Sequence, residues 1–178
     1  MTLSRLPVVQ VASHLLPWPG ANAVRSMRRQ ALDVTVQTAF GPLRTVNTHL
    51  EFHSAAQREA QIVRLLDLQE EASTGPLSAK REHAEPYGAQ TLAASSLLCG
   101  DFNFDVSDPQ HALLQKSNRP GLKYRDAWTI RQGECPHAPT CCIQHRAQWT
   151  NGVRCRYFFC VTEVLSRRVS GLVKLVTV

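Results

Sequence analysis

The chain has 178 residues, of which 43% are hydrophobic and 19% are charged, a composition typical of a folded globular protein rather than a disordered one. The 20 Lys and Arg residues exceed the 14 Asp and Glu residues, and the net charge of +6 favours an anionic partner such as nucleic acid, a phosphate ester or a lipid headgroup. A basic surface without a specific partner is an equally open interpretation. The sequence shows neither an apolar run of membrane-spanning length nor a signal-peptide pattern, so we expect a cytoplasmic protein with reduced cysteines.

The N-terminal part of the sequence predicts a hairpin. Residues 1–30 contain several prolines and a glycine that interrupt any long element, and we expect no regular structure there. Apolar and polar side chains alternate over residues 31–40, which predicts a strand with one buried face. After a Gly-Pro turn, residues 43–50 predict a second strand, so the two strands form a hairpin.

A helix and a buried strand are predicted next. Residues 54–72 have the apolar spacing of an amphipathic helix, and Ser54 with Gln57 three residues later matches a capping box. Residues 73–92 are rich in Pro, Gly and polar residues, which predicts a surface loop. Residues 92–99 predict a buried strand that ends before a glycine.

The C-terminal part of the sequence predicts a short helix and two closing strands. The helix begins after Asp108, and residues 131–152 lack periodicity and are expected to be a loop. Residues 156–164 and 169–178 predict the strands. This order predicts a single α/β domain over residues 1–178, with helices covering a sheet. Since the chain stops inside its last apolar run, we expect that domain to be incomplete.

Two strand ends carry candidate catalytic groups. The segment VNTHLE places His49 where it can donate to a phosphate oxygen or transfer a proton near neutral pH. In CGDFNFD, Gly100 permits a sharp turn, after which Asp101 can accept a proton from water or bind a metal ion and Asn103 can donate to a phosphate oxygen. Structural roles remain open, since a lone histidine is often partly buried and Asp and Asn are common turn residues. Because ligands favour such sheet edges, we expect His49, Asp101 and Asn103 to lie together there.

Three segments carry a resemblance to a known family. In this order and at these spacings, VNTHLEFHSAAQREAQ, LLCGDFNFDVSDP and YRDAW resemble the endonuclease/exonuclease/phosphatase family, and HLLPWPG, HAPT and AQWTNG resemble a bacterial subgroup of it. The resemblance covers nearly the whole chain from Leu3 onward. It implies a four-layer α/β sandwich, in which two mainly antiparallel sheets pack face to face with helices outside. It also implies hydrolysis of phosphodiesters or phosphomonoesters with Mg²⁺ or Mn²⁺.

The resemblance also implies roles for individual residues. Asp101 would orient or deprotonate the attacking water, Asn103 would bind the phosphate, and His49 would stabilise the developing charge or act as an acid. Asn47, in the same segment as His49, is a further candidate for substrate binding. Asp101 and Asn103 are the candidate metal ligands.

The chain departs from the family pattern in three places. The strand with an Asn and the Glu that is the main metal ligand of the family would precede Leu3. Arg156 stands where the family has an Asp that orients the catalytic histidine, and the closing Ser-Asp-His motif would lie beyond Val178. We therefore expect a fragment of a metal-dependent phosphoesterase, monomeric and possessing only part of the family's site.

Two alternatives accompany this interpretation. The first is a non-catalytic relic that binds phosphate or nucleic acid through basic residues, although scattered arginines are also typical of a solvated surface. Its candidate residues are Arg25, Arg28, Arg29, Arg167 and Arg168. The second is a truncated or wrongly started reading frame, whose product would expose unpaired strand edges and fold poorly.

The cysteines form one further candidate cluster. Residues 135–145 contain Cys135, His137, Cys141, Cys142 and His145. Their spacing matches no zinc finger or ribbon, so we expect free loop thiols, with a structural Zn²⁺ site as the alternative. Cys155 and Cys160 lie in or near a predicted strand and are expected to be small core residues.

Overall fold

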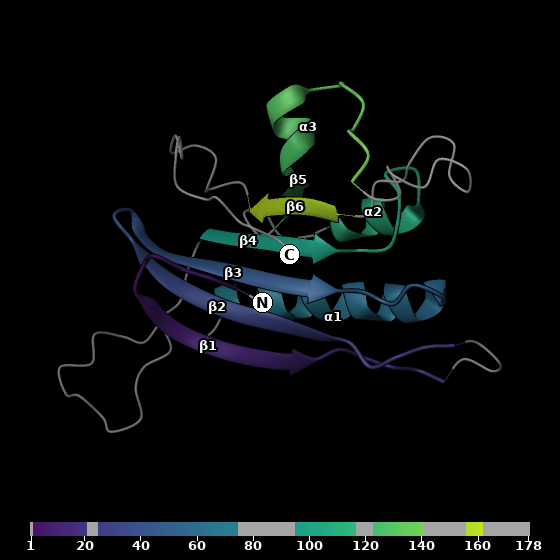
Figure 1. The fold of residues 1–178 in the computed structure, drawn as a ribbon, viewed down its shortest axis with the longest axis horizontal. Helices are drawn as coiled ribbons and strands as arrows, with labels where there is room; N and C mark the ends of the chain where they lie inside the picture. The colour runs from purple at the N-terminus through teal and green to yellow at the C-terminus, as the bar shows by residue number, and fades with distance from the viewer. Residues whose placement is uncertain (1, 21–24, 75–94, 117–122, 141–155, 162–178) are drawn as a thin grey trace.

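The structure is a computed structural model that describes residues 2–20, 25–74, 95–116, 123–140 and 156–161 (Figure 1). Six strands form one mixed sheet in the order β1-β2-β3-β4-β6-β5. The strands are β1 (Val8–Leu15), β2 (Gln30–Thr38), β3 (Gly41–His49), β4 (Ser95–Asp101), β5 (Tyr124–Asp126) and β6 (Arg156–Val161), and the helices are α1 (Ala55–Thr74), α2 (Pro109–Leu114) and α3 (Ala127–Gln132). Within the described ranges, no helix has the length and apolar character needed to cross a membrane.

The predicted hairpin is confirmed. Strands β2 and β3 pair antiparallel from Ala31 opposite Thr48 to Thr38 opposite Gly41. Strand β4 then lies parallel to β3, and α1 is part of the connection between them. The other neighbouring strands pair antiparallel, so the sheet is mainly antiparallel with one parallel pair at its centre.

The prediction of irregular structure over residues 1–30 is wrong for β1. This strand pairs antiparallel with β2 at the edge of the sheet, and the two prolines at positions 7 and 17 flank it rather than interrupt it. Side chains on one side of β1 remain exposed, among them Val11 and Leu15. Hydrogen bonding to the free edge of β2 stabilises the strand, which is a tertiary effect that the proline spacing does not reveal.

The helix predicted over residues 54–72 is confirmed as α1, but its capping box is only half formed. Ser54 Oγ accepts a hydrogen bond from the backbone N–H of Gln57 at 3.3 Å. The side chain of Gln57 does not return the bond: its Oε1, the atom that would accept it, is buried without a hydrogen-bond partner among the described residues, while its Nε2 donates to the carbonyl of Pro19 at 2.6 Å. The residue that would complete the cap therefore fastens the β1–β2 loop to α1.

The two short helices also differ from the prediction in detail. Helix α2 begins after Asp108 as predicted, but the Asp108 carboxylate accepts from the backbone N–H of Asp105 at 2.7 Å instead of from the helix. Helix α3 lies partly in the segment expected to be a loop and is capped by Asp126, whose carboxylate accepts from the N–H of Trp128. The start of a short helix such as α3 depends on one capping side chain, and the spacing of apolar residues does not reveal such a cap.

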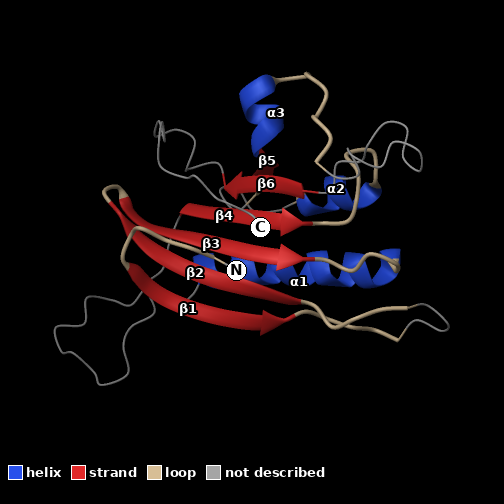
Figure 2. Cartoon of the chain, in the orientation of Figure 1, coloured by secondary structure: helices blue, strands red, loops and turns tan. Residues whose placement is uncertain are grey.

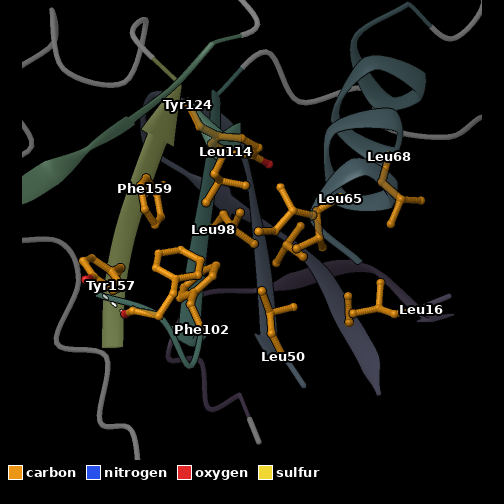
Figure 3. Packing of buried hydrophobic residues seen from close by; sticks show 14 of the residues in the cluster. Leu16, Leu50, Leu65, Leu68, Leu98, Phe102, Leu114, Tyr124, Tyr157 and Phe159 are labelled. Carbon is orange, nitrogen blue, oxygen red and sulfur yellow. Dashed lines mark hydrogen bonds between the residues drawn. The ribbon is translucent and has the colours of Figure 1, made fainter. Parts of the chain in front are cut away.

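The main core lies between the sheet and helices α1 and α2, as Figures 2 and 3 show. Leu65 from α1 points toward Leu98 of β4 (Figure 3), and Leu68 and Phe159 belong to the same buried cluster. The buried members of this core are Leu16, Ala31, Val46, Leu50, Ile62, Leu65, Leu68, Leu98, Phe102, Phe104, Leu114, Tyr124, Tyr157, Phe159 and Val161. A smaller cluster around Val34, Val36 and Leu43 contains no helix residue, so it lies on the opposite face of the sheet.

The predicted α/β class is confirmed in its coarse form. The described residues form one sheet with α1 and α2 on one face, and a second sheet is not among them. The predicted strand over residues 169–178 and nearly all of the predicted loop over residues 73–92 lie outside the described ranges. The strand predicted over residues 156–164 is found as β6, and the one over residues 92–99 as β4.

Candidate functional site

Three strands bring His49, Asp101 and Arg156 into one row. His49 pairs with Asp101 across β3 and β4, and Asp101 pairs with Arg156 across β4 and β6. Residues paired in register point to the same face of a sheet. Leu98 lies three residues before Asp101 on β4, and Phe159 lies three residues after Arg156 on β6, so both point to the opposite face from the row. Leu98 and Phe159 belong to the core beneath α1, and the row therefore lies on the face away from α1. The Nε atom of Arg156 is 3.9 Å from Oδ2 of Asp101.

Gly100 allows β3 and β4 to meet closely beside this row. Its φ of +145° lies in a region that residues with a side chain rarely adopt. A Cβ atom at this position would be 1.8 Å from the carbonyl oxygen of Thr48 on β3. Directly after the strands, the backbone N–H of Leu50 donates to the carbonyl of Asp101 at 2.9 Å. The glycine thus allows the strand ends that carry His49 and Asp101 to remain paired.

Asn103 closes the turn after β4. It has a left-handed φ of 52°, and its backbone N–H donates to Oδ1 of Asp101 at 3.2 Å. Its side-chain Nδ2 donates to the carbonyl of Leu50 at 2.8 Å. An amide NH₂ group has two hydrogens, so this bond leaves one donor available. The predicted turn role and the predicted binding role of Asn103 are therefore compatible, and phosphate binding by Asn103 stays a prediction.

Asn47 lies on the same face of β3 as His49, two residues before it. It pairs with Leu32 on β2 and with Cys99 on β4, and it is partly buried. The sequence therefore places Asn47 and His49 on one face, with Asn47 farther from the strand end. Its predicted role in substrate binding is not tested by this geometry.

Glu51 is a site residue that sequence reasoning missed. Its carboxylate is buried, accepts hydrogen bonds from the backbone N–H groups of Phe52, His53 and Met27, and lies 3.6 Å from Nε of Arg29. Burial would raise the pKa of Glu51, but the backbone hydrogen bonds and Arg29 outweigh it and lower the pKa. The position of Glu51 two residues after His49 could have indicated that Glu51 lies near the row. Nothing in the sequence indicates that Arg29 lies beside Glu51.

Polar side chains of α1 attach the surrounding loops to one another. Gln61 Oε1 accepts from the backbone N–H of Glu51 at 2.9 Å, and Gln61 Nε2 donates to the carbonyl of Pro17 at 3.3 Å. Nη1 of Arg58 donates to the carbonyls of both Glu51 and Phe52 at 2.9 Å. The β1–β2 loop and the β3–α1 loop are therefore held together beside the row.

His49 has a lowered pKa. Partial burial is the largest cause, and the positive charges of Arg29 and Arg156 act in the same direction. The negative charges of Asp101 and Glu51 oppose the shift without cancelling it. At neutral pH His49 is therefore mainly a neutral imidazole, which can donate one hydrogen bond and accept another.

The described residues do not fit the predicted metal site by themselves. Among them, no three His, Cys, Asp or Glu side chains are grouped so that they could hold a metal ion. Asp101 supplies one carboxylate, whose Oδ2 lies near the guanidinium of Arg156. Mg²⁺ and Mn²⁺ require several oxygen ligands, and an adjacent positive charge opposes their binding.

A second polar cluster surrounds Asp126, in the YRDAW segment. Its side chain is fully buried, and Oδ2 lies 3.0 Å from Nε2 of His111 and 3.4 Å from Nε2 of His137. Burial would raise the pKa of Asp126, but the hydrogen bonds from His111 and the N–H of Trp128, together with His137, lower it. The cluster joins α2, β5 and the segment after α3.

The predicted cysteine cluster is described only in part. His137 contacts Asp126, and Cys135 is an exposed free thiol, which agrees with the expectation for that residue. Cys141, Cys142, His145 and Cys155 lie outside the described residues. Cys160 is buried, as predicted, and burial raises the pKa of its thiol to about 11.

The chain is similar to several solved structures. No protein-family model and no curated protein sequence matches it. The catalytic domain of human Nocturnin with bound sulfate aligns with a TM-score of 0.59 and 17% identity, over 89% of this chain and 49% of that chain. An endonuclease/exonuclease/phosphatase from Bacteroides vulgatus aligns with a TM-score of 0.61 and 15% identity, over 87% and 54% of the two chains.

A third similar structure is the mannosyl-6-phosphatase of Bacteroides thetaiotaomicron, with a TM-score of 0.59 and 15% identity over 88% of this chain and 53% of that one. The chain spans about half the length of each of these structures. At this level of identity the likeness concerns the fold alone. The chain has the fold of the endonuclease/exonuclease/phosphatase family.

Proposed function

We propose that this chain binds a phosphate ester at the row formed by His49, Asp101 and Arg156 and hydrolyses it with water. The observation that carries the proposal is the pairing of His49 with Asp101 at the carboxyl ends of two parallel strands. Ligands of sheets that contain parallel strands bind at this edge. Similar folds in proteins named as a phosphatase and an endonuclease/exonuclease/phosphatase support the same reaction class.

Each residue has a chemical role in this proposal. The neutral imidazole of His49 donates to a phosphate oxygen, and Asn103 donates the amide hydrogen that Leu50 does not take. Asp101 accepts a hydrogen bond from the attacking water and orients it toward phosphorus. Arg156 and Arg29 supply positive charge where negative charge develops on the phosphoryl oxygens.

Mg²⁺ or Mn²⁺ is the cofactor that the family resemblance implies. A bound divalent ion polarises the phosphoryl group and lowers the pKa of a bound water. Because the described residues supply a single carboxylate near Arg156, the roles above involve only the chain's own side chains.

A second candidate function is phosphate-ester binding without hydrolysis. The observation that favours it is the proximity of Arg156 to Asp101, because a guanidinium with its Nε 3.9 Å from Oδ2 of the carboxylate supplies positive charge that attracts an anion. The row then acts as an anion site in which Arg156 and His49 contact the phosphate.

Hydrolysis of bis-p-nitrophenyl phosphate and of p-nitrophenyl phosphate tests the two candidates. We expect the purified chain to release p-nitrophenol, and Asp101→Ala to abolish the release. The rates are measured with added Mg²⁺, with added Mn²⁺ and with EDTA. Asp67→Ala is the matched control, because Asp67 is an exposed carboxylate on α1. Equal rates in the Asp101 variant and the parent would overturn the site. Phosphate binding without release of p-nitrophenol would select the second candidate.

A further inference from the structure

The two edge strands of the sheet differ in how they are protected. Strand β5 has three residues and leads directly into α3, so little of its edge is open. Strand β1 lies at the other edge, has eight residues and, in the part of the chain that the structure describes, pairs only with β2 (Figure 1). Natural edge strands tend to be short or to carry charged residues or proline, because an open edge pairs with other strands. The sequence of β1, VVQVASHL, contains no Lys, Arg, Asp, Glu or Pro.

Exposed apolar side chains gather on this strand. Among the described residues, four of the twelve exposed large hydrophobic side chains belong to β1, namely Val8, Val9, Val11 and Leu15. Val11 is 61% exposed and Leu15 is 69% exposed. Val11 pairs with Val34, a member of the smaller cluster on the face away from α1, and Leu15 lies on the same side because side chains alternate along a strand. Apolar surface therefore lies directly beside the open backbone of β1.

The hydrogen bonding between β1 and β2 shows which backbone groups of β1 face outward. In an antiparallel pair, residues that bond to the neighbouring strand alternate with residues whose N–H and C=O groups point away from it. The N–H of Leu16 donates to the carbonyl of Arg29 at 2.9 Å, so every second residue from Leu16 back to position 10 bonds to β2. The outward N–H and C=O groups between them belong to Val11, Ser13 and Leu15.

We infer that β1 pairs antiparallel with β1 of a second copy of this chain, about a two-fold axis at Ser13, so that the two sheets join into one. In this register Ser13 lies opposite Ser13 of the second copy, and Val11 lies opposite Leu15 of the second copy. Each outward residue exchanges its backbone hydrogen bonds with the residue opposite, and the exposed Val11 and Leu15 side chains become cross-strand neighbours. The same patch serves in both copies, which closes a symmetric dimer. A two-fold axis at Val11 would bring the bulge at Val9 into the pairing, so Ser13 is the position that fits.

The distribution of charge favours a second copy as the occupant of this edge. The chain has a net charge of +6, so two copies repel each other over most of their surfaces. Strand β1 has one titratable side chain, His14, whose Nε2 lies 3.5 Å from Oδ2 of Asp33 in its own copy. In the dimer His14 would face the uncharged Ala12 of the second copy. The pairing therefore places no like charges opposite each other, and β1 offers no charge that would select an oppositely charged partner.

The inference goes beyond the proposed function and does not depend on it. Strand β2 separates β1 from β3, so the pairing does not involve the row of His49, Asp101 and Arg156. One strand pair with a few apolar side chains lies at or below the roughly 1,200 Å² that stable interfaces bury. We therefore expect a reversible dimer with a dissociation constant in the micromolar range.

Sedimentation equilibrium of the full chain tests the inference. The average mass should rise from one to two chain masses with increasing concentration, and added salt should strengthen association because it screens the repulsion between two basic chains. Ser13→Pro should weaken the dimer by at least about tenfold, because proline removes an outward N–H without touching the bonds to β2. Ser13→Ala is the matched control: it also loses the bond from Ser13 Oγ to Oε1 of Gln30 but keeps the N–H, and it should dimerise like the parent.

A second set of variants tests the register. Val11→Lys should weaken the dimer by at least about tenfold, because it places a charge opposite Leu15 of the second copy. Val63→Lys makes the same change at an exposed position of α1 and should alter the affinity by no more than about twofold. Adding Leu15→Glu to Val11→Lys places a carboxylate opposite each new lysine and should recover part of the lost affinity. Circular dichroism and thermal unfolding of each variant identify losses that arise from loss of folding.

Each result supports or overturns the inference without reference to hydrolysis. A monomer at every concentration, the state expected from the sequence, would overturn it. A dimer that both Ser13→Pro and Val11→Lys leave unchanged would show that the copies meet at another surface and would also overturn it. Equal weakening by Val11→Lys and Val63→Lys would assign the effect to net charge and overturn it. Weakening by Ser13→Pro and Val11→Lys, with unchanged dimers in Ser13→Ala and Val63→Lys, would support it.

Discussion

Arg156 lies directly opposite Asp101 on adjacent strands, with its Nε 3.9 Å from Oδ2 of the carboxylate. A guanidinium at this distance opposes the approach of a cation to the carboxylate. The positive charges of Arg29 and Arg156 both lower the pKa of His49. The row therefore has the positive surroundings that attract an anion. The proposed phosphate site therefore has a positive side chain, Arg156, where the family resemblance would have a carboxylate.

Replacing Arg156 by Asp should exchange anion binding for cation binding. We expect Arg156→Asp to weaken the binding of a non-hydrolysable phosphate ester by about tenfold and to strengthen Mn²⁺ binding by a similar factor, because one positive charge becomes negative near Asp101. Isothermal titration calorimetry measures both affinities. Arg131→Asp, on the exposed side of α3, is the control for the change in net charge. Equal effects of the two substitutions would show that Arg156 acts only through the overall charge.

His49 should titrate below its ordinary pKa of about 6.5 in the free protein. Burial and the neighbouring arginines disfavour the imidazolium, so ester binding should strengthen as the pH falls through that lowered pKa and His49 gains a charge. Arg156→Gln removes one of the opposing charges and should raise the pKa of His49. An NMR titration of the imidazole carbon-bound protons measures the pKa directly. An unchanged or lower value in Arg156→Gln would contradict this account of the shift.

Gly100→Ala should strongly destabilise the fold. The added Cβ atom would be 1.8 Å from the carbonyl oxygen of Thr48, and the positive φ is unfavourable for alanine, so β3 and β4 would have to separate. We expect a loss of at least about 3 kcal/mol in the free energy of unfolding, measured by urea denaturation. Gly20→Ala, where nothing lies within 4 Å of the added Cβ, should change the stability by less than about 1 kcal/mol.

Asp126→Ala should also destabilise the fold, by about 2–4 kcal/mol, because it removes the N-cap of α3 and the carboxylate that two partly buried imidazoles contact. The pKa of Asp126 is lowered in the folded state, so its contribution is fully present above the unfolded value of about 3.9 and is lost as the pH falls through the folded pKa. Urea denaturation at pH 7 and pH 3 measures this. The difference between parent and variant should shrink at pH 3, and a constant difference would exclude a contribution from the ionised carboxylate.

The sequence predicted the central elements where local pattern and tertiary environment agree. Alternation over residues 31–40 and 43–50 and the apolar spacing of residues 54–72 reflect which side chains face the core, and the same periodicity exists in the structure. The sequence did not predict β1, β5 or α3. Strand β1 depends on pairing with the edge of β2, and α3 depends on one capping bond from Asp126.

The candidate site was predictable in part for the same reason. The motifs predicted that His49 and Asp101 lie at one edge of the sheet, because each residue stands at the end of a strand-like segment. The motif did not reveal that the amide of Asn103 donates to the carbonyl of Leu50, nor that Glu51 joins two loops. These bonds connect residues that are distant in the sequence or belong to different elements, and no local pattern encodes them.

The sequence by itself determined the β2–β3 hairpin, strands β4 and β6, the α1 helix, the chemical groups at the strand ends and the excess of positive charge, because each depends on nearest neighbours in the chain or on composition. Only the tertiary structure decided that Arg156 lies 3.9 Å from Asp101, that Arg29 faces Glu51, and that Trp18 and Phe52 are exposed beside them. The physical reason is that charge interactions and burial depend on distances through space. Those distances are set by the register of β3, β4 and β6 and by the packing of loops against α1.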